Sequence, residues 1–234
     1  MIRIGLFIKT IWEDFVSLIF PEVCLTCNDV LLKNETHICT HCQLELPVTG
    51  YHKSINDNPV YNDLKIIENL TGAAAYLKYN RHGKAQVLLH QLKYKGNYEV
   101  GVKLGQMYGS HLSEVIQADI MVPVPIHKSK LKQRGYNQTM AICEGLQSSL
   151  SIPIDTESIL RTKLTSTQTK KHKVDRWLAM EGIFGVSNPQ AITGKRVLIV
   201  DDVITTGATL YSLCQVINQH DPKSIQIISI ASGK

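Results

Sequence analysis

Short apolar runs alternate along the chain with segments of helical periodicity. Short apolar runs predict strands at residues 72–79, 120–125, 196–200 and 225–231, with a further candidate within 152–160. Apolar residues at helical spacing predict helices at residues 84–91 and 100–116. Two more helices are predicted: one follows the basic segment 128–138 and continues to about residue 150, and the other follows Gly207. This alternation is typical of an α/β fold, with a parallel sheet flanked by helices.

Three segments precede this α/β region of residues 71–234. Residues 1–20 carry apolar residues at helical spacing and predict an amphipathic helix packed on the protein, with peripheral membrane contact as the alternative. Residues 21–50 hold a cysteine cluster, and residues 51–70 begin with a polar stretch that predicts a linker. Charged residues interrupt the first segment, so we expect neither a transmembrane helix nor a signal peptide, and a cytoplasmic location.

Four cysteines in residues 21–50 have the spacing of metal ligands. They form two Cys-x-x-Cys pairs, made of Cys24, Cys27, Cys39 and Cys42. Two such pairs can close a tetrahedral shell of four sulfur atoms around Zn²⁺, which would provide folding energy to a segment with few apolar residues. The sequence therefore predicts a structural zinc ribbon, with disulfides and an iron–sulfur cluster as the alternatives.

Positive charge is concentrated in two segments of a chain whose formal net charge is +5. Residues 127–136 contain no acid and four cations, namely Lys128, Lys130, Lys132 and Arg134. The second segment, residues 160–176, includes Lys170, Lys171, Lys173 and Arg176. Such clusters favour polyphosphates or nucleic acid as ligands, although two solvated basic loops would give the same pattern.

Residues 197–209 combine a buried strand, two acids and a loop of small residues, in the order VLIVDDVITTGAT. Ligands of open α/β sheets bind beyond the carboxyl ends of strands, so Asp201 and Asp202 are expected at a site, where they can accept hydrogen bonds from a diol or hold Mg²⁺. Backbone N–H groups and hydroxyls can then converge on a phosphate at Thr205, Thr206, Gly207, Ala208 and Thr209, called here the 205–209 loop. The alternative is that the two acids only cap the next helix.

The segment 197–209 resembles the motif that binds 5-phosphoribosyl-1-pyrophosphate (PRPP) in type I phosphoribosyltransferases. The order of the other motifs is similar to that of the ComF family, which includes ComFC and the GntX-like proteins. These motifs are the four cysteines, LKYKG at residues 92–96, VPVP at 122–125, QRGYNQ at 133–138, and TQT at 167–169 ahead of Arg176. One position departs from the family pattern, because Ala179 stands where an asparagine is expected.

The resemblance implies a type I phosphoribosyltransferase fold and a role in handling incoming DNA during natural competence. It also implies that PRPP or another phosphorylated ribose binds with its 5-phosphate on the 205–209 loop and its diol on Asp201 and Asp202. Mg²⁺ and a basic group would bind the pyrophosphate, with contributions from Lys93, Tyr94, Lys95, Gly96 and Arg134.

Two other functions stay open from the sequence. The first is an enzyme, of nucleotide salvage or related metabolism, that transfers the phosphoribosyl group to an unidentified acceptor, with Asp201 and Asp202 as its catalytic residues. The second is a protein that binds single-stranded DNA through the two basic segments, with Tyr136 and Trp177 as candidates for stacking on bases, and that works with a competence ATPase.

Overall fold

A computed structural model describes residues 19–162 and 182–233. The chain divides into two compact units, and the boundary lies between Leu46 and Pro47. Most of the predicted N-terminal helix lies outside the described residues. So does the predicted mobile loop after residue 162, which carries Trp177 and the predicted DNA-binding residues Lys170, Lys171, Lys173 and Arg176.

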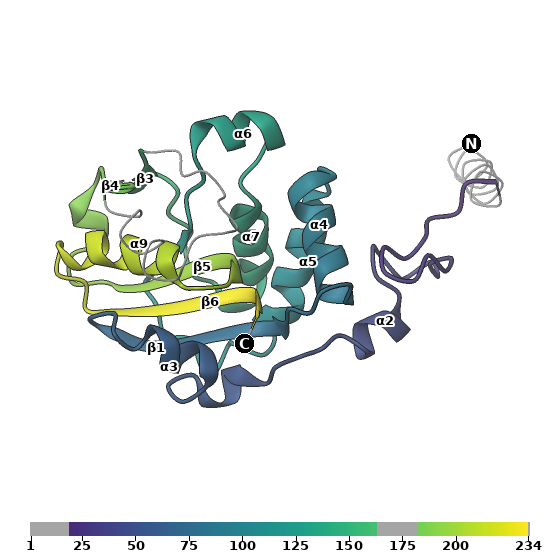
Figure 1. Cartoon of the computed structure of the whole chain (residues 1–234), viewed down its shortest axis with the longest axis horizontal. Coiled ribbons are helices and arrows are strands. Elements are labelled where there is room, and N and C mark those ends of the chain that lie inside the picture. The colour runs from purple at the N-terminus through teal and green to yellow at the C-terminus, as the bar shows by residue number, and fades with distance from the viewer. Residues whose placement is uncertain (1–18, 163–181, 234) are drawn as a thin grey trace, which may run out of the picture. The chain divides into compact units, whose positions relative to one another are not determined.

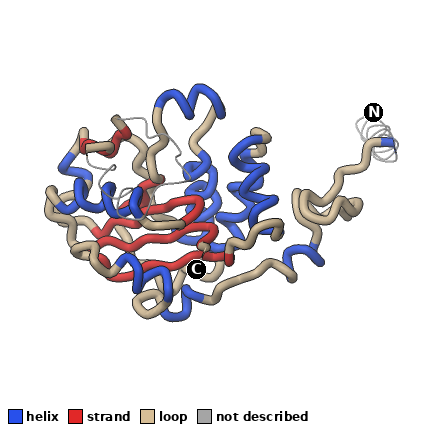
Figure 2. The backbone as a smooth tube through the Cα atoms, viewed as in Figure 1, coloured by secondary structure: helices blue, strands red, loops and turns tan. Residues whose placement is uncertain are grey.

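The larger unit is built on a four-stranded parallel sheet (Figures 1 and 2). Its strands are β1 (Leu70–Lys78), β2 (Ile120–Pro123), β5 (Arg196–Ile204) and β6 (Ser224–Ser232). They lie in the order β1-β6-β5-β2, and each neighbouring pair is parallel. Parallel strands require crossover connections, which the intervening helices provide. The predicted α/β architecture is therefore confirmed.

Helices cover both faces of this sheet (Figure 1). The helices α3 (Pro59–Leu64) and α9 (Ala208–Asn218) contribute to one hydrophobic core together with alternate strand residues such as Val197 and Ile199. Side chains alternate along a strand, so Leu198 and Val200, which are also fully buried, face the other side. On that side lie α4 (Lys84–Tyr94), α5 (Tyr98–Gly109) and α7 (Gln138–Leu150).

Two glycines allow α5 and α7 to pack in direct backbone contact. A Cβ atom on Gly145 would lie 2.8 Å from both the backbone nitrogen of Gln106 and the Cα atom of Gly105. A Cβ atom on Gly105 would lie 2.9 Å from the Cα atom of Gly145. Because backbone atoms cannot move aside as side chains do, neither position accepts a larger residue without separating the helices.

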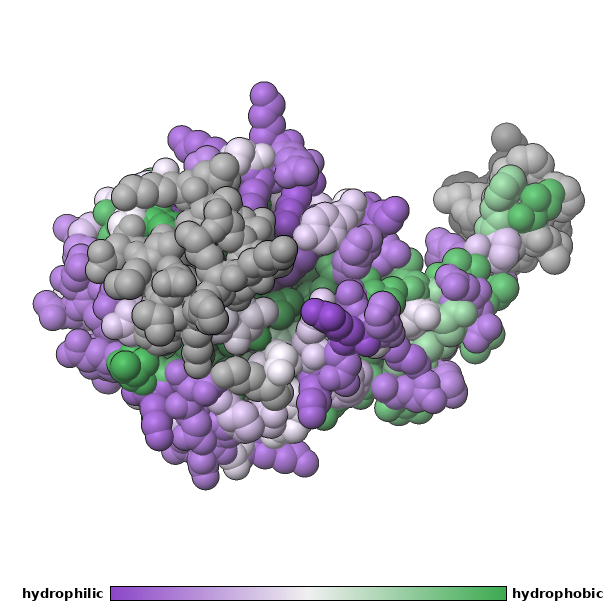
Figure 3. All heavy atoms as spheres, in the orientation of Figure 1, coloured by the Kyte–Doolittle hydropathy of each residue, from purple (hydrophilic) through white to green (hydrophobic). Residues whose placement is uncertain are grey.

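The visible surface of the larger unit is mostly hydrophilic, as expected for a domain whose apolar residues are in its core (Figure 3). In the part of the chain that the structure describes, no helix has the length and apolar character needed to cross a membrane.

The segment predicted as a linker, residues 51–70, is structured. It contains η1 (Tyr51–Ser54) and α3, whose Val60 and Leu64 are buried in the core. Asn58 caps α3 by accepting from Val60 N, and its Nδ2 donates to the Ala73 carbonyl in β1 at 2.8 Å. The polar residues that suggested an irregular connection therefore include a buried capping group, which composition alone does not reveal.

Some element boundaries differ from the sequence prediction. The strand β5 extends to Ile204, so Asp201 and Asp202 lie within it, because β6 continues to pair with it as far as Ser232. The helix α5 ends at Gly109, seven residues before the predicted end at residue 116. The basic segment after β2 forms a helix of its own, α6 (Lys128–Arg134), which ends at Gly135 in the left-handed conformation.

The remaining described elements are short. The strands β3 (Ile159–Arg161) and β4 (Phe184–Val186) pair as a separate antiparallel sheet, and η2 (Pro189–Ala191) follows them. Only the end of the strand candidate within residues 152–160 is a strand, although Ile154 forms an isolated bridge with Met121. In the smaller unit, α2 (Thr40–Leu44) follows two isolated antiparallel bridges.

Candidate functional site

A cavity of about 580 Å³ lies at the carboxyl ends of the central strands. Residues that follow β1, β2 and β5 line it, including Tyr79, Val124 and Thr205. This is the position where open parallel sheets bind ligands. Of the predicted site residues, the cavity is lined by Lys93, Tyr94, Lys130, Arg134, Asp201, Asp202, Thr205 and Thr209.

Asp202 is held between two helices on one side of β5. Its Oδ1 atom lies 2.9 Å from Nζ of Lys93, in the last turn of α4. Its Oδ2 atom accepts a hydrogen bond of 3.0 Å from Nε2 of Gln138, the first residue of α7. Asp202 is 7% exposed, so this ion pair and hydrogen bond compensate the burial of its charge.

Asp201 is more accessible than Asp202 and lies in a different environment. Its Oδ1 atom accepts a hydrogen bond of 2.8 Å from the backbone nitrogen of Asp202. Burial and repulsion by Asp202 raise the pKa of Asp201 to about 7, although the charges of Lys93 and Arg161 oppose this shift. Burial lowers the pKa of Lys93, but attraction to Asp202 and Asp201 outweighs burial and leaves its pKa above the ordinary value.

The 205–209 loop forms a smaller hollow beside the acids. Gly207 adopts the left-handed conformation, with φ of 77°, and is the N-cap of α9. No side chain caps this helix end, so its first backbone N–H groups are available to an anion. The hollow has a volume of about 30 Å³ and is lined by Asp201 and all five loop residues, Thr205, Thr206, Gly207, Ala208 and Thr209.

The cavity carries more positive than negative groups. Its described lining includes four cationic side chains, from Lys93, Lys130, Arg134 and Arg161, against the two aspartates. Burial, followed by repulsion from Arg161 and Arg134, lowers the pKa of Lys130. A polyanion entering the cavity would relieve this repulsion between like charges.

An exposed aromatic side chain stands at the same cavity. Tyr94 is 66% exposed, and its ring centroid lies 5.0 Å from that of His90 and 5.5 Å from Cζ of Arg134. The other tyrosine considered for base stacking, Tyr136, has a structural role instead. Its hydroxyl donates to the Leu92 carbonyl, and its ring packs edge-on against Tyr98.

Four of the described predicted site residues line neither the cavity nor the hollow at the 205–209 loop. They are Lys95, Gly96, Lys128 and Lys132. Conversely, sequence reasoning missed Gln138, Arg161, Tyr79 and His90. The motif QRGYNQ includes Gln138, but nothing in the motif indicates that its side chain contacts Asp202, because that contact requires α7 to lie against β5.

The four predicted metal ligands of the smaller unit lie together. The Sγ atoms of Cys24, Cys27, Cys39 and Cys42 are all within 4.8 Å of one another. Those of Cys27 and Cys39 are 3.7 Å apart. Zn–S bonds of about 2.3 Å place tetrahedral sulfur atoms roughly 3.8 Å apart. None of the four forms a disulfide, and the cluster can hold a metal ion such as zinc.

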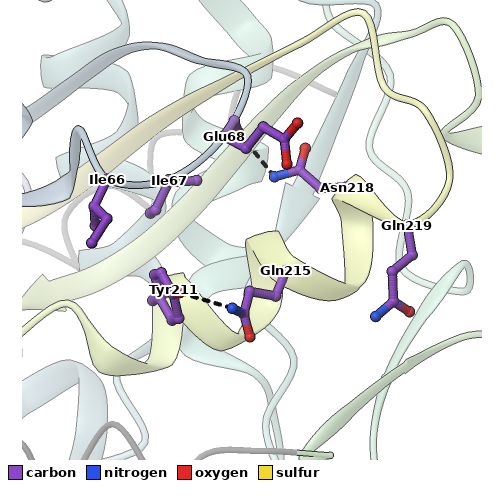
Figure 4. Close-up of a pocket in the computed structure, with 7 residues that line it drawn as sticks. All are labelled: Ile66, Ile67, Glu68, Tyr211, Gln215, Asn218 and Gln219. Atoms are coloured by element: carbon purple, nitrogen blue, oxygen red, sulfur yellow. Dashed lines mark hydrogen bonds between the residues drawn. The ribbon is translucent and has the colours of Figure 1, made fainter.

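A second cavity, of about 400 Å³, lies between α9 and the turn after α3 (Figure 4). Polar groups in its lining bond to one another: Gln215 donates to the Tyr211 hydroxyl at 2.8 Å, and Asn218 donates to the Glu68 carbonyl at 2.9 Å (Figure 4). Neither the acid pair nor the 205–209 loop lines this cavity, so we do not place the predicted chemistry here.

Comparisons with known proteins agree with the fold. The family model of the phosphoribosyl transferase domain matches residues 121–234. The chain is 30% identical over 232 residues to DNA utilization protein YhgH of Escherichia coli strain K12. This alignment covers 88% of this chain and 95% of that protein. It is also 28% identical over 197 residues to competence protein ComFC of Bacillus subtilis strain 168, in an alignment that covers 81% of this chain and 75% of that protein.

Solved structures show a more distant likeness. The glutamine PRPP amidotransferase from B. subtilis is 14% identical, with a TM-score of 0.42, over 60% of this chain and 30% of that chain.

Proposed function

The chain belongs to the ComF family, and from this premise we propose that it binds PRPP or another phosphorylated ribose in the 580 Å³ cavity. The 5-phosphate is assigned to the 205–209 loop, and the diol to Asp201 and Asp202. Because relatives are named DNA utilization protein YhgH and competence protein ComFC, we place this binding in the uptake or use of DNA.

One observation carries this proposal: the small hollow at the 205–209 loop and the larger cavity share residues. Asp201, Thr205 and Thr209 line both. A ligand with a phosphate in the hollow therefore extends directly past the acid pair. Backbone N–H groups at the start of α9 favour the phosphate of this ligand, and the carboxylates of Asp201 and Asp202 favour its hydroxyl groups.

The residues of the cavity also suit Mg²⁺. This ion prefers carboxylate and phosphate oxygens and retains several waters, so Asp201 with the pyrophosphate of PRPP is an appropriate ligand set. Burial and the neighbouring Asp202 raise the pKa of Asp201, so a cation beside this carboxyl would favour its ionised form. When bound, the ion would neutralise charge on the pyrophosphate.

The chain's own cations would bind the rest of that charge. Arg134 and Lys130 line the cavity, and Arg134 is anchored beside Tyr94. Lys93 is paired with Asp202, and its ammonium has further N–H donors for a pyrophosphate in the cavity. Turnover would further require an acceptor held at the anomeric carbon, as in an enzyme of nucleotide metabolism.

Isothermal titration calorimetry with PRPP, with and without Mg²⁺, tests the proposal. We expect binding to the wild type, and a loss of about tenfold or more for Asp201→Asn. Asp221→Asn is the matched control, because Asp221 is exposed, lies outside the cavity lining and has a positive φ that asparagine accepts. No binding to the wild type in either condition would contradict the proposal. Release of pyrophosphate with a panel of bases and amines separates turnover from binding.

A second candidate function is the binding of single-stranded DNA. Tyr94 supports it, because an exposed ring beside a guanidinium is suited to stacking on a base. Fluorescence anisotropy with a labelled oligothymidine should show weaker binding for Tyr94→Leu than for the control Tyr61→Leu, whose tyrosine lies outside this cavity. Substituting Lys128, Lys130 and Lys132 by glutamine should reduce the salt dependence of binding. Unchanged affinity in both sets of variants would remove this function.

For the smaller unit we propose a structural Zn²⁺ held by the four cysteines. Two backbone N–H groups support thiolates there: Cys39 N donates to Cys24 Sγ at 3.3 Å, and Cys42 N donates to Cys39 Sγ at 3.4 Å. Elemental analysis of protein purified without chelator should give one zinc per chain. A result without zinc or with iron would overturn the assignment.

A further inference from the structure

We propose that Gln138 determines the sugar specificity of the cavity, because its side-chain carbonyl accepts a hydrogen bond from a ring hydroxyl of the pentose. The site would therefore prefer ribose 5-phosphate to a deoxyribose 5-phosphate. This inference rests on the proposed function, and it adds a residue that the motif of residues 197–209 does not contain.

The backbone around Gln138 is fixed by contacts to the end of β2. Asn137 is the N-cap of α7, and its Nδ2 donates to the Val124 carbonyl at 3.2 Å. The Thr139 hydroxyl donates to the same carbonyl at 2.9 Å. Gln138 lies between these two anchors, is 5% exposed and lines the cavity. With its backbone fixed in this way and its Nε2 bonded to Asp202, the Gln138 side chain has a defined position at the cavity.

The two ends of the Gln138 amide have different environments. Its Nε2 donates to Asp202 Oδ2, while its Oε1 is buried and has no hydrogen-bond partner among the described residues. The reverse orientation would place the amide oxygen against a carboxylate oxygen, and two acceptors repel. Because Lys93 donates to one Asp202 oxygen and the other lies 3.0 Å from the Gln138 amide, the donor end of that amide is the one directed to Asp202.

An unpaired acceptor in this position requires a donor. Buried acceptors without a donor destabilise the protein, and a ligand that supplies the donor binds more tightly for that reason. Phosphate and pyrophosphate oxygens are acceptors at neutral pH and would be repelled. The Lys93 ammonium contacts Asp202 and forms no hydrogen bond with Gln138 Oε1. Of the groups on a phosphorylated pentose, only the hydroxyls can donate to Gln138 Oε1.

This placement divides the ligand between two ends of the cavity. The phosphate lies on the 205–209 loop, where backbone N–H groups are directed outward. The hydroxyls lie toward Asp202 and Gln138, which together present oxygen atoms on the α7 side of β5. A site that offers a buried acceptor to a hydroxyl rejects the analogue that lacks it, because the acceptor is then left unpaired.

Calorimetric titrations of the full-length protein with ribose 5-phosphate, 2-deoxyribose 5-phosphate and 3-deoxyribose 5-phosphate test the inference. We expect the wild type to prefer ribose 5-phosphate to at least one deoxy analogue by about tenfold. Gln138→Met, which keeps the length of the side chain and removes its polar atoms, should abolish that preference. Gln147→Met, an exposed position on the same helix, should leave it unchanged.

A second variant separates the acceptor from the contact to Asp202. Gln138→Glu keeps an oxygen in the cavity but replaces the donor to Asp202 by a second carboxylate oxygen, so repulsion should weaken the overall affinity while the preference is retained. Thermal unfolding of each variant confirms that it is folded.

The outcomes distinguish the two proposals. If the wild type binds ribose 5-phosphate without preference, or if Gln138→Met keeps the preference, the role of Gln138 is refuted while the proposed function stands. If Gln138→Glu loses the preference together with Gln138→Met, the contact to Asp202 is responsible and the inference is also refuted. If the wild type binds neither PRPP nor any of the three pentose phosphates, both proposals are overturned.

Discussion

Replacing Lys93 by methionine tests whether the pair with Asp202 stabilises the larger unit. The substitution keeps the aliphatic stem and removes the only cation within salt-bridge distance of Asp202 among the described residues. Removing one partner of a buried pair destabilises proteins by about 3–5 kcal/mol. The Lys93 side chain is 22% exposed and Gln138 still donates to Asp202, so we expect a smaller loss, of about 2–3 kcal/mol.

Urea unfolding followed by circular dichroism, with metal present throughout, provides the assay. Lys95→Met is the control, because Lys95 is exposed and lies two residues away. Lys93→Met and Asp202→Asn should each destabilise, while the double variant should lose less than the sum of the two, with a coupling of about 1–2 kcal/mol. Additive losses, or a Lys93→Met variant as stable as Lys95→Met, would refute the reasoning.

Three further predictions concern packing, pH and metal. Gly145→Ala should destabilise the larger unit by about 1–3 kcal/mol, because the new Cβ meets the α5 backbone; an unchanged urea midpoint would contradict it. The raised pKa of Asp201 means that the folded state retains a proton that the unfolded state loses above pH of about 4, so stability should fall as pH rises from about 4 to about 7. Asp201→Asn should remove this component, and equal pH slopes for both proteins would exclude it. Removing the metal with a chelator should increase amide hydrogen exchange in residues 19–46 and leave the amides of β1 protected. If the amides of β1 also lose protection, the two units do not unfold independently.

Local patterns were sufficient for much of the fold. The helix α4 begins at Lys84 as predicted, and β6 spans the predicted residues 225–231 with one further residue at each end. These elements have strong periodicity and sharp boundaries, which sequence reasoning detects well. The segment at residues 51–70 and α6 were not predicted as helices, because a polar composition hides the capping by Asn58 and a run of cations resembles a solvated loop.

The chemistry of the candidate site was partly contained in one contiguous segment. A strand, two acids and a glycine-containing turn are adjacent in sequence, so local geometry alone places Asp201 beside the 205–209 loop. Likewise, the two Cys-x-x-Cys pairs are close enough in sequence to predict a single cluster. These features depend on bonds and turns within a few residues, and for that reason the sequence by itself determined them.

Only the tertiary structure decided which residues contact the acids. Lys93 and Gln138 lie 109 and 64 residues before Asp202, on different helices, and they meet it because α4 and α7 pack on the same side of the sheet. Such contacts depend on helix packing, including the close approach of α5 and α7 at their glycines, and no short-range pattern encodes it. The buried acceptor of Gln138 and the perturbed pKa of Asp201 are consequences of that packing.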